Sequence, residues 1–221
     1  MEHVVERVSD PERVAAITAR LASDDVLIAD GHHRYAISRT YRDDVRETTG
    51  RTDTPAELVL TFVNELVAEQ LSVEAIHRLY ADITFADLED ALGRFFVLEP
   101  YDGPGPDTLA DMAAEGFLVL VGPSGAWRLT PAPGEFAGVR ALDGAWLETA
   151  LADVPHQVTY QHGVDEVLAA IATGEPTAAV LIRPVSVAEI ERTAREGLLM
   201  PPKSTFFTPK LKTGFVIRPL D

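Results

Sequence analysis

The chain has 221 residues, of which 46% are hydrophobic and 24% are charged, a composition typical of a folded globular protein rather than a disordered one. Its 19 lysines and arginines against 35 acidic residues give a net charge of −16, which disfavours binding to a nucleic-acid backbone. There is no cysteine, so disulfides and thiolate metal sites are excluded; since no apolar run approaches the roughly 20 residues of a membrane span, we expect a cytoplasmic protein.

The first predicted element is a helix that begins near Ser9. Ser9 and Glu12 have the spacing of a capping box, and a proline between them suits the first turn of a helix. Val14, Ile17 and Leu21 then recur at helical spacing.

A strand, a tight turn and a second helix are expected next. The continuous apolar run at residues 26–29 predicts a buried strand, Asp30-Gly31 interrupts it, and the pattern from His32 to about Tyr41 is helical. Residues 43–56 are polar and are expected to form a surface loop.

The middle of the chain is expected to mix strands with one more helix. Residues 58–66 suit a strand, although a helix fits them too, and residues 76–80 predict another strand. A helix capped by Thr84 follows over residues 84–95. Residues 100–106 hold three prolines and two glycines, which makes this loop the best candidate for an internal boundary.

The rest of the chain alternates strands and helices, which favours an α/β or α+β fold with a mixed sheet and flanking helices. The sequence is consistent with two parts, residues 1–99 and 107–221, or with one continuous domain. The elements expected after residue 106 are a short helix, a hairpin of strands 117–121 and 127–129, a strand at 158–160, a helix at 164–172 ended by Gly174, a strand at 178–182, a helix from a Ser186–Glu189 capping box to Gly197, and a strand at 214–217.

The strongest candidate site is the turn from Asp30 to Arg34. A glycine between a strand and a helix lets the backbone approach a ligand closely, and the helix N-terminus offers N–H groups and a positive dipole end. His32, His33 and Arg34 are misplaced at such an end unless an anion shares it. Arginine can hold phosphate oxygens bidentately, so the turn predicts a site for a phosphate-bearing small molecule, with Asp30 placed to hold Mg²⁺ or to orient a histidine. The alternative is that Asp30 caps the helix and the histidines are solvated.

Zinc binding is the rival use of two neighbouring histidines. Adjacent histidines point in different directions and rarely bind one metal together, and His77 and His162 could join them only if the fold brought them close. We therefore favour the anion site over a zinc site.

A second candidate is the loop that contains Lys203, Ser204 and Thr205, preceded by two prolines and followed by Lys210 and Lys212. One charge and two hydroxyls could grip an anion, although no Gly-x-x-x-x-Gly-Lys sequence makes this a P-loop. It is the only concentrated positive charge in an acidic chain, and we expect it to lie near the Asp30–Arg34 turn. The alternative is a solvated basic loop that its two phenylalanines anchor to the core.

His77 and Arg78 form a third, weaker candidate inside an apolar stretch. Neighbouring residues of a strand face opposite sides, so one of the two could line a site. A satisfied surface pair fits the sequence equally well.

These segments together resemble domain-of-unknown-function family 1015. The resemblance rests on Ile28-Ala-Asp-Gly-His-His-Arg-Tyr35, on Ile76-His-Arg-Leu79, and on Met200-Pro-Pro-Lys-Ser-Thr-Phe-Phe-Thr-Pro-Lys210 with Thr213-Gly214. It covers nearly the whole chain and is loosest over residues 100–150. The family's helix usually reads Arg-Tyr-Glu, whereas Ala36 stands here at the glutamate position, so a carboxylate role at that position is absent.

The turn is also similar to the phosphate-binding turn of the ParB/sulfiredoxin-like group, which includes free L-serine kinases. This resemblance implies that Gly31, His32, His33 and Arg34 bind the phosphates of a nucleotide. Together with the residues themselves, it leads us to expect ATP or ADP, with Mg²⁺ on Asp30 and with further phosphate contacts from Lys203, Ser204 and Thr205. The implied reaction is phosphoryl transfer to a small hydroxyl compound such as free L-serine.

The resemblance also bears on the catalytic base. Such kinases tend to use a carboxylate upstream of the turn, and here only 29 residues precede Asp30. We therefore expect the carboxyl-terminal part of a larger ancestral design, with Glu6, on a predicted strand at residues 4–8, as the best base beside Asp30 and His33. The alternatives are a nucleotide-binding regulatory module without turnover and a catalytically incomplete remnant; a homo-oligomer is compatible with each.

Overall fold

The computed structural model describes residues 4–201, 203–208, 210 and 216–220. The chain divides into two compact units, one formed by Met1–Phe62 with Gly214–Asp221 and the other by Val63–Thr213. The predicted boundary at residues 100–106 lies inside the second unit, where it covers the end of strand β3 (Phe96–Tyr101) and most of the connection to helix α4 (Thr108–Glu115).

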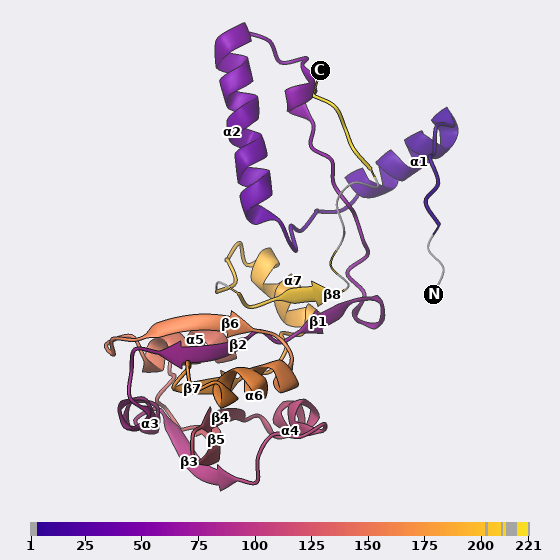
Figure 1. Cartoon of the computed structure of the whole chain (residues 1–221). Coiled ribbons are helices and arrows are strands. Elements are labelled where there is room, and N and C mark those ends of the chain that lie inside the picture. The colour runs from indigo at the N-terminus through magenta and orange to yellow at the C-terminus, as the bar shows by residue number, and fades with distance from the viewer. Residues whose placement is uncertain (1–3, 202, 209, 211–215, 221) are drawn as a thin grey trace. The chain divides into compact units, whose positions relative to one another are not determined.

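The described part of the first unit contains the α-helices α1 (Pro11–Ala22) and α2 (His32–Thr49) and the short 3-10 helix η1 (Pro55–Glu57) (Figure 1). The N-cap of α1 is Asp10, whose carboxylate accepts a hydrogen bond from the Arg13 N–H at 2.8 Å. The predicted cap at Ser9 is therefore wrong by one residue, because the carboxylate takes the position that the serine was expected to fill.

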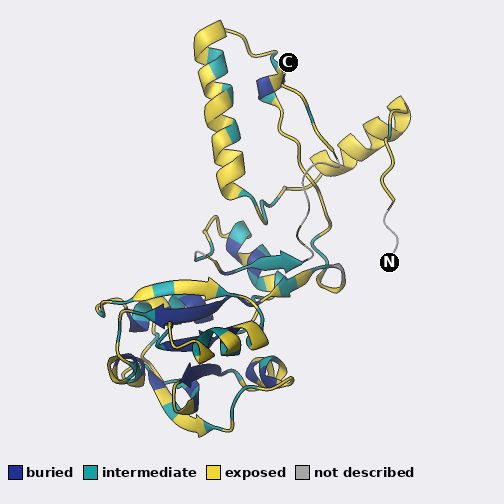
Figure 2. Ribbon diagram, viewed as in Figure 1, coloured by how far each residue is buried: buried dark blue, intermediate teal, exposed yellow. Residues whose placement is uncertain are grey.

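Helix α2 begins as predicted but is longer than expected. It starts after Gly31 and ends at Gly50, and both glycines adopt a left-handed conformation. It therefore continues past the predicted end near Tyr41 and takes up half of the predicted loop at residues 43–56. No described residue of α1 or α2 is buried, and Figure 2 draws the two helices in the exposed and intermediate colours.

Three predicted strands in the first third of the chain are wrong. Residues 4–8, 26–29 and 58–66 have no regular secondary structure. A strand needs a neighbouring strand to satisfy its N–H and C=O groups, and the described residues before strand β1 (Ser72–Glu74) form no such ladder. The apolar run at 26–29 is consequently not buried: Val26 is 63% exposed.

Polar contacts hold the rest of the first unit together. The Arg46 guanidinium donates two hydrogen bonds to the Glu57 carboxylate, at 2.8 and 2.5 Å, and so joins α2 to η1. Arg218 donates to the carbonyl oxygens of Leu58 at 2.9 Å and Pro55 at 2.6 Å. The C-terminal segment therefore belongs to the same unit as the N-terminal helices.

The second unit is built on a six-stranded sheet with the order β3-β5-β4-β7-β2-β6, in which all described pairings are antiparallel. The predicted strands at 76–80, 117–121, 127–129, 158–160 and 178–182 are confirmed, and β3 is an addition. The strands are β2 (His77–Ala81), β3 (Phe96–Tyr101), β4 (Leu118–Gly122), β5 (Gly125–Pro131), β6 (Gln157–Gln161) and β7 (Ala178–Leu181).

Helices cover both faces of this sheet, which confirms the predicted α/β or α+β fold with flanking helices. The described strands pair antiparallel throughout, so the sheet is not the mixed one that was expected. Helices α3 (Phe85–Gly93) and α5 (Asp143–Ala150) pack on one face, against a core that includes Tyr80 of β2. Helices α4 (Thr108–Glu115) and α6 (Val164–Ala172) pack on the other face, against a core that includes Leu79. Neighbouring residues of β2 thus enter opposite cores, as the alternation of a strand requires.

Local sequence signals in this unit predict the structure well. Thr84 accepts a hydrogen bond from the Asp87 N–H and caps α3. Ser186 accepts one from the Glu189 N–H and caps α7 (Val187–Arg195). Gly174 has a φ of 79° just after α6, as expected for a glycine that ends a helix.

A separate two-stranded sheet joins distant parts of the second unit. Strand β1 (Ser72–Glu74), which follows the 3-10 helix η2 (Ala68–Gln70), pairs antiparallel with β8 (Phe206–Thr208). The predicted strand at 214–217 lies partly outside the described residues, and its described part, residues 216–217, forms no strand.

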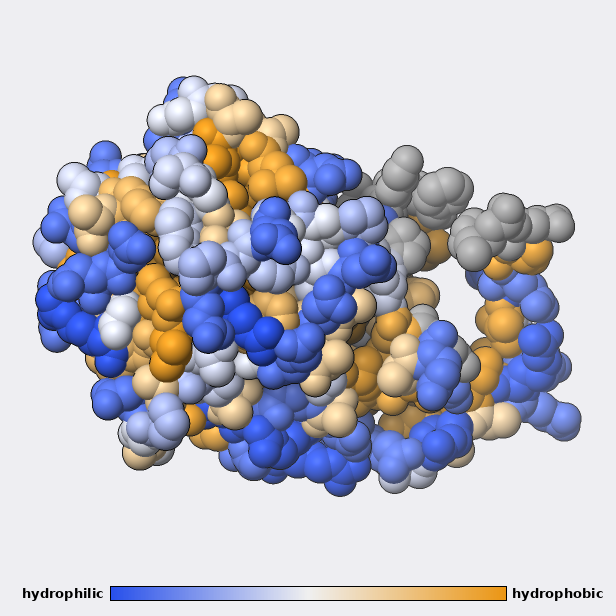
Figure 3. Space-filling view, turned by 90° about the horizontal axis from the view of Figure 1, so that it is seen from below, coloured by the Kyte–Doolittle hydropathy of each residue, from blue (hydrophilic) through white to orange (hydrophobic). Residues whose placement is uncertain are grey.

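The surface seen in Figure 3 is largely hydrophilic, with hydrophobic residues in separate patches between the hydrophilic ones. Within the described part of the chain, no helix is both long enough and apolar enough to cross a membrane.

Candidate functional site

The Asp30–Arg34 turn has the backbone of an anion-binding helix start. Gly31 is the N-cap residue of α2, with φ 88° and ψ 26°, and its carbonyl oxygen accepts the Tyr35 N–H at 2.9 Å. No side-chain hydrogen bond caps this helix. The N–H groups of the first turn therefore have no capping side chain in front of them, which is the condition under which a phosphate binds there.

Asp30 supports the turn instead of capping the helix. Its Oδ1 accepts the Gly31 N–H at 2.8 Å, and its Oδ2 lies 3.5 Å from Nη2 of Arg34. The interpretation that Asp30 caps the helix is thus not supported.

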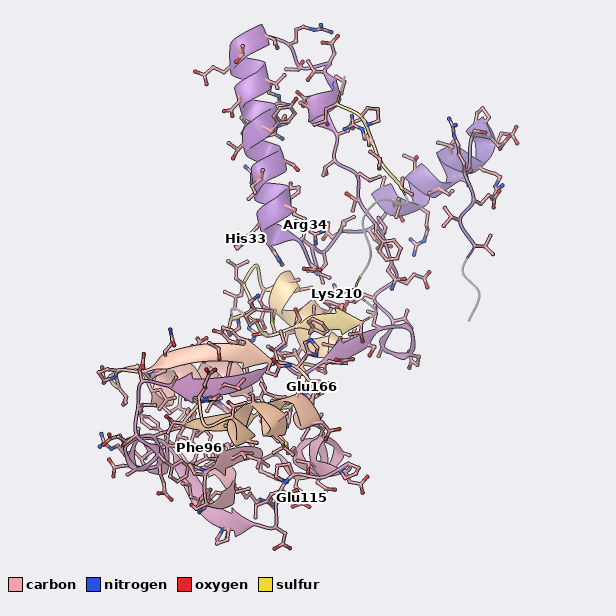
Figure 4. The ribbon with its side chains drawn as sticks, viewed as in Figure 1. His33, Arg34, Phe96, Glu115, Glu166 and Lys210 are labelled. Carbon is pink, nitrogen blue, oxygen red and sulfur yellow. The ribbon has the colours of Figure 1, made fainter. Side chains whose placement is uncertain are left out.

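Gly31 is required for a second reason besides its positive φ. A Cβ at this position would lie 2.9 Å from Nη2 and 3.1 Å from Nε of Arg34, so the guanidinium passes directly over the glycine. The Arg34 side chain is nevertheless 75% exposed, and Figure 4 shows Arg34 and His33 at the start of α2. The turn therefore presents a guanidinium to solvent beside the helix N-terminus.

The charges of the first turn suit an anion. His32, His33 and Arg34 are all exposed, and the first turn holds no acidic residue. The nearby carboxylate is that of Asp30. It could be only one of the six ligands of a Mg²⁺ ion, whose other ligands are usually phosphate oxygens and water molecules. The described residues contain no group of three or more potential metal ligands, so the residues fit a metal held jointly with a nucleotide rather than by the protein alone.

Glu6 lies in a different setting from the one predicted for it. It belongs to a segment without regular structure, its side chain is 64% exposed, and its carboxylate pairs with Arg13 at 3.0 Å. Its role as a base remains a prediction that does not rest on a strand.

The Lys203–Thr205 loop is both anchored and partly accessible. Lys203 is exposed and has a left-handed backbone with φ 57°, while Ser204 is buried and its hydroxyl donates to the Pro201 carbonyl at 2.7 Å. Thr205 is half-buried. Lys203 is accordingly the accessible polar group of the loop, and the Ser204 donor is used by the fold.

Two contacts hold this loop, although Phe206 packs on the exposed His162 rather than on the core to which the phenylalanines were predicted to anchor it. The Phe206 ring stacks on the His162 ring with centroids 4.6 Å apart, and Nη1 of Arg78 donates to the Lys203 carbonyl at 3.2 Å. Lys212 lies outside the described residues. Because the Asp30–Arg34 turn belongs to the first unit and this loop to the second, their expected proximity remains a prediction.

His77 and Arg78 are more important to the structure than the sequence analysis predicted. Both are buried, so the interpretation as a surface pair is wrong. His77 accepts the Ile182 N–H at its Nδ1, at 3.2 Å, and burial lowers its pKa to about 4. The available signal was two ionisable residues inside an apolar strand, a combination that calls for a specific partner whenever the strand is buried.

Comparison with known proteins places these features in a family. A family model described as "Protein of unknown function (DUF1015)" matches residues 1–150. The chain belongs to this family. The DUF1015 match includes the turn at 30–34 and the His77-Arg78 pair, whereas the loop at 203–205 lies beyond the matched residues.

Solved structures of free serine kinase have a similar fold. A mutant in complex with AMP is 14% identical over 91% of this chain and 81% of that chain, with a TM-score of 0.52. A second mutant with AMP gives a TM-score of 0.53 over 92% and 82%, and the kinase without a stated mutation, also with AMP, gives 0.51 over 91% and 81%. At this identity the likeness concerns the fold. No curated protein matches the sequence, and the likeness of the turn to the ParB/sulfiredoxin-like group remains a prediction.

Proposed function

We propose that this DUF1015 protein binds ATP or ADP through the first turn of α2 and transfers a phosphoryl group to a small hydroxyl compound, with free L-serine as the leading candidate. The observation that carries the proposal is a helix N-terminus without a side-chain cap, which begins at a left-handed glycine and displays His32, His33 and an exposed arginine. The similar fold of free serine kinase bound to AMP supports the choice of an adenine nucleotide and of the acceptor.

Phosphoryl transfer requires mainly positioning and charge neutralisation. The N–H groups of residues 32–34 would receive phosphate oxygens, and the Arg34 guanidinium would hold two of them. Its present contact with Asp30 is long, 3.5 Å, and exposed, so replacing it with a phosphate costs little. Asp30 could then turn to Mg²⁺, which would neutralise charge on the transferred group.

The acceptor hydroxyl must lose a proton as its oxygen attacks the terminal phosphorus and the nucleotide leaves with one phosphate fewer. His33, exposed in the first turn, is the candidate base closest in sequence to the phosphate site. Asp30 and Glu6 are the alternatives. If the Glu6→Gln variant retains full turnover, the base that accepts this proton is one of the turn residues, His33 or Asp30.

Nucleotide affinity tests the central claim. Arg34→Ala should weaken ATP or ADP binding about 10- to 100-fold in calorimetry, as expected for the loss of a charge-assisted pair with phosphate. Arg39→Ala is the matched control, because Arg39 is also exposed on α2 but lies beyond its first turn, and it should bind as the wild type does. Equal affinity of wild type and Arg34→Ala would remove the proposal.

A turnover assay separates the proposal from its alternatives. The chain is incubated with Mg²⁺, L-serine and ATP or ADP, and O-phosphoserine is measured. Binding of nucleotide without product favours a regulatory module, and neither binding nor product favours a remnant.

A further inference from the structure

Arg78 is a buried cation without a carboxylate partner among the described residues. It lies on β2 and is 4% exposed. Nη1 donates to the carbonyl oxygens of Ile76 and Lys203, and the guanidinium lies 4.9 Å from the centre of the Tyr160 ring. Nη2, by contrast, is buried and has no hydrogen-bond partner in the described part of the structure.

A guanidinium placed in this way is energetically costly. Burial lowers the pKa of Arg78, and the groups that oppose this effect are Tyr80 and Tyr160, followed by the carboxylates of Glu148 and Asp143. Asp143 is already engaged: it accepts the Arg183 backbone N–H at 2.8 Å and two bonds from the Arg183 guanidinium. Arg78 therefore retains a positive charge and one donor group that the described protein groups do not satisfy.

The backbone of α5 makes room for this donor group. A Cβ on Gly144 would lie 2.9 Å from Nη2 of Arg78, so the glycine lets the guanidinium reach the first turn of α5. A cation next to a helix N-terminus is unfavourable unless an anion joins them.

Arg78 lines a small cavity, and Glu148 lines it too. The apolar part of the wall is formed by Leu147, Leu151 and Val158. Glu148 is exposed and, like Arg78, takes part in no ion pair between described residues. The cavity thus carries opposite charges on two side chains that are not paired with each other.

The size of the cavity limits what can enter it. Its volume is about 40 Å³, room for roughly three water molecules at the 10–15 Å³ that each needs. A carboxylate group fits this space, with the rest of a ligand extending toward Glu148. A phosphate is larger and would bring at least one further negative charge close to Glu148.

We propose that this cavity binds a small zwitterionic α-amino acid, whose carboxylate is held by Arg78 and whose ammonium group is held by Glu148. The assignment of such a ligand as the phosphoryl acceptor rests on the proposed function, whereas the binding itself does not. His156 and Tyr80 support the wall: Nδ1 of His156 donates to the Val154 carbonyl at 2.7 Å, and its ring meets the Tyr80 ring edge-on at 5.5 Å.

A ligand series tests the two charges without altering the protein. Binding of L-serine, ethanolamine and glycerate is measured by calorimetry in the absence of nucleotide; ethanolamine lacks the carboxylate and glycerate lacks the ammonium group. L-serine should bind, and each analogue should bind at least tenfold more weakly. No detectable binding of L-serine at millimolar concentration overturns the proposal, and glycerate binding as tightly as L-serine overturns the role of Glu148.

Variants test the side chains. Glu148→Gln should weaken L-serine binding at least fivefold and leave glycerate binding unchanged or stronger. Glu175→Gln is its control, because Glu175 is exposed and does not line the cavity. Arg78→Lys keeps the charge but loses the fork of donors and should weaken binding at least tenfold. Unchanged affinity of a folded Arg78→Lys variant for L-serine overturns the proposal. If this variant fails to fold, the proposal is decided by Glu148→Gln and by the ligand series.

Arg34→Ala distinguishes a failure of this inference from a failure of the proposed function. It should leave L-serine affinity unchanged in the absence of nucleotide. Loss of nucleotide binding with L-serine binding intact supports both sites, whereas nucleotide binding without any L-serine binding overturns the cavity alone.

Discussion

Two single residues, His77 and Gly31, have effects that can be measured separately: His77 on the stability of the fold, and Gly31 on the phosphate site. His77 is buried in the neutral form because its Nδ1 accepts the Ile182 N–H. Gly31 combines a positive φ with direct contact to Arg34.

His77 should make the fold less stable in acid. Its pKa is about 4 in the folded chain against 6.5 for an unperturbed histidine, so between these values the unfolded state takes up a proton that the folded state refuses. The neutral histidine therefore contributes fully to the free energy of unfolding above pH 6.5. This contribution, about 3 kcal/mol, is lost as the pH falls toward 4.

Urea unfolding of the wild type and His77→Asn at pH 7.5 and 5 measures this effect. Asparagine can still accept the Ile182 N–H but does not titrate, so His77→Asn should lose clearly less stability between the two pH values. An equal loss in both proteins would assign the pH dependence to other groups.

Gly31→Ala should damage the phosphate site more than the fold. Gly31 and Gly50 bound the same helix with φ of 88° and 68°, so alanine at either position costs on the order of 1 kcal/mol of backbone strain. The added Cβ meets Arg34 only at position 31, since nothing lies within 4 Å at position 50. Calorimetry should therefore show weaker nucleotide binding for Gly31→Ala than for Gly50→Ala; equal weakening would mean that the position of Arg34 is unimportant.

At the scale of elements, one ion pair joins the end of β7 to the start of α5. Asp143 is 7% exposed and receives both the backbone N–H and the guanidinium of Arg183, and these hydrogen bonds raise the pKa of Arg183. This contact fixes α5, and with it the wall of the amino-acid cavity, against the central sheet.

Removing that carboxylate should cost much more than removing one on the surface. Asp143→Ala leaves a half-buried guanidinium and a backbone N–H without their partner, so we expect a loss of about 2–3 kcal/mol in urea unfolding. Asp90→Ala breaks the exposed pair of Asp90 with Arg94 and should cost less than about 0.5 kcal/mol. Similar costs for both would show that the Asp143 contact does not fix α5.

The elements that the sequence predicts correctly are those with local signals. The caps at Thr84 and Ser186 and the hairpin of β4 and β5 depend on residues within a few positions of one another. The predicted strand at residues 26–29 is wrong because a strand forms only where a second strand pairs with it, and that partner can lie far away in the sequence. The Arg78 cavity could not be predicted for the same reason, because Arg78 contacts the Lys203 carbonyl across 125 positions of the chain.

At the scale of the whole molecule, the two units differ in how much they bury. The buried hydrophobic side chains belong to the second unit except for Ala56, among the residues described. Amide protection depends on cooperative burial, so amides of α1 and α2 should exchange with deuterium orders of magnitude faster than those of β4 and β7. Mass spectrometry of the exchanged protein measures this, and equally slow exchange in α2 would reveal that a partner covers it.

The pairing of β1 with β8 has a consequence for the architecture of the gene product. Ser72 lies opposite Thr208, so the polypeptide passes into and out of the sheet-bearing unit through adjacent strands, about 5 Å apart as antiparallel neighbours are. The other unit is formed by Met1–Phe62 and Gly214–Asp221. This is the layout of a domain inserted into a loop of another domain. Residues 63–213 could therefore be moved into a loop of a different protein without separating β1 from β8, the two strands at which the inserted unit begins and ends.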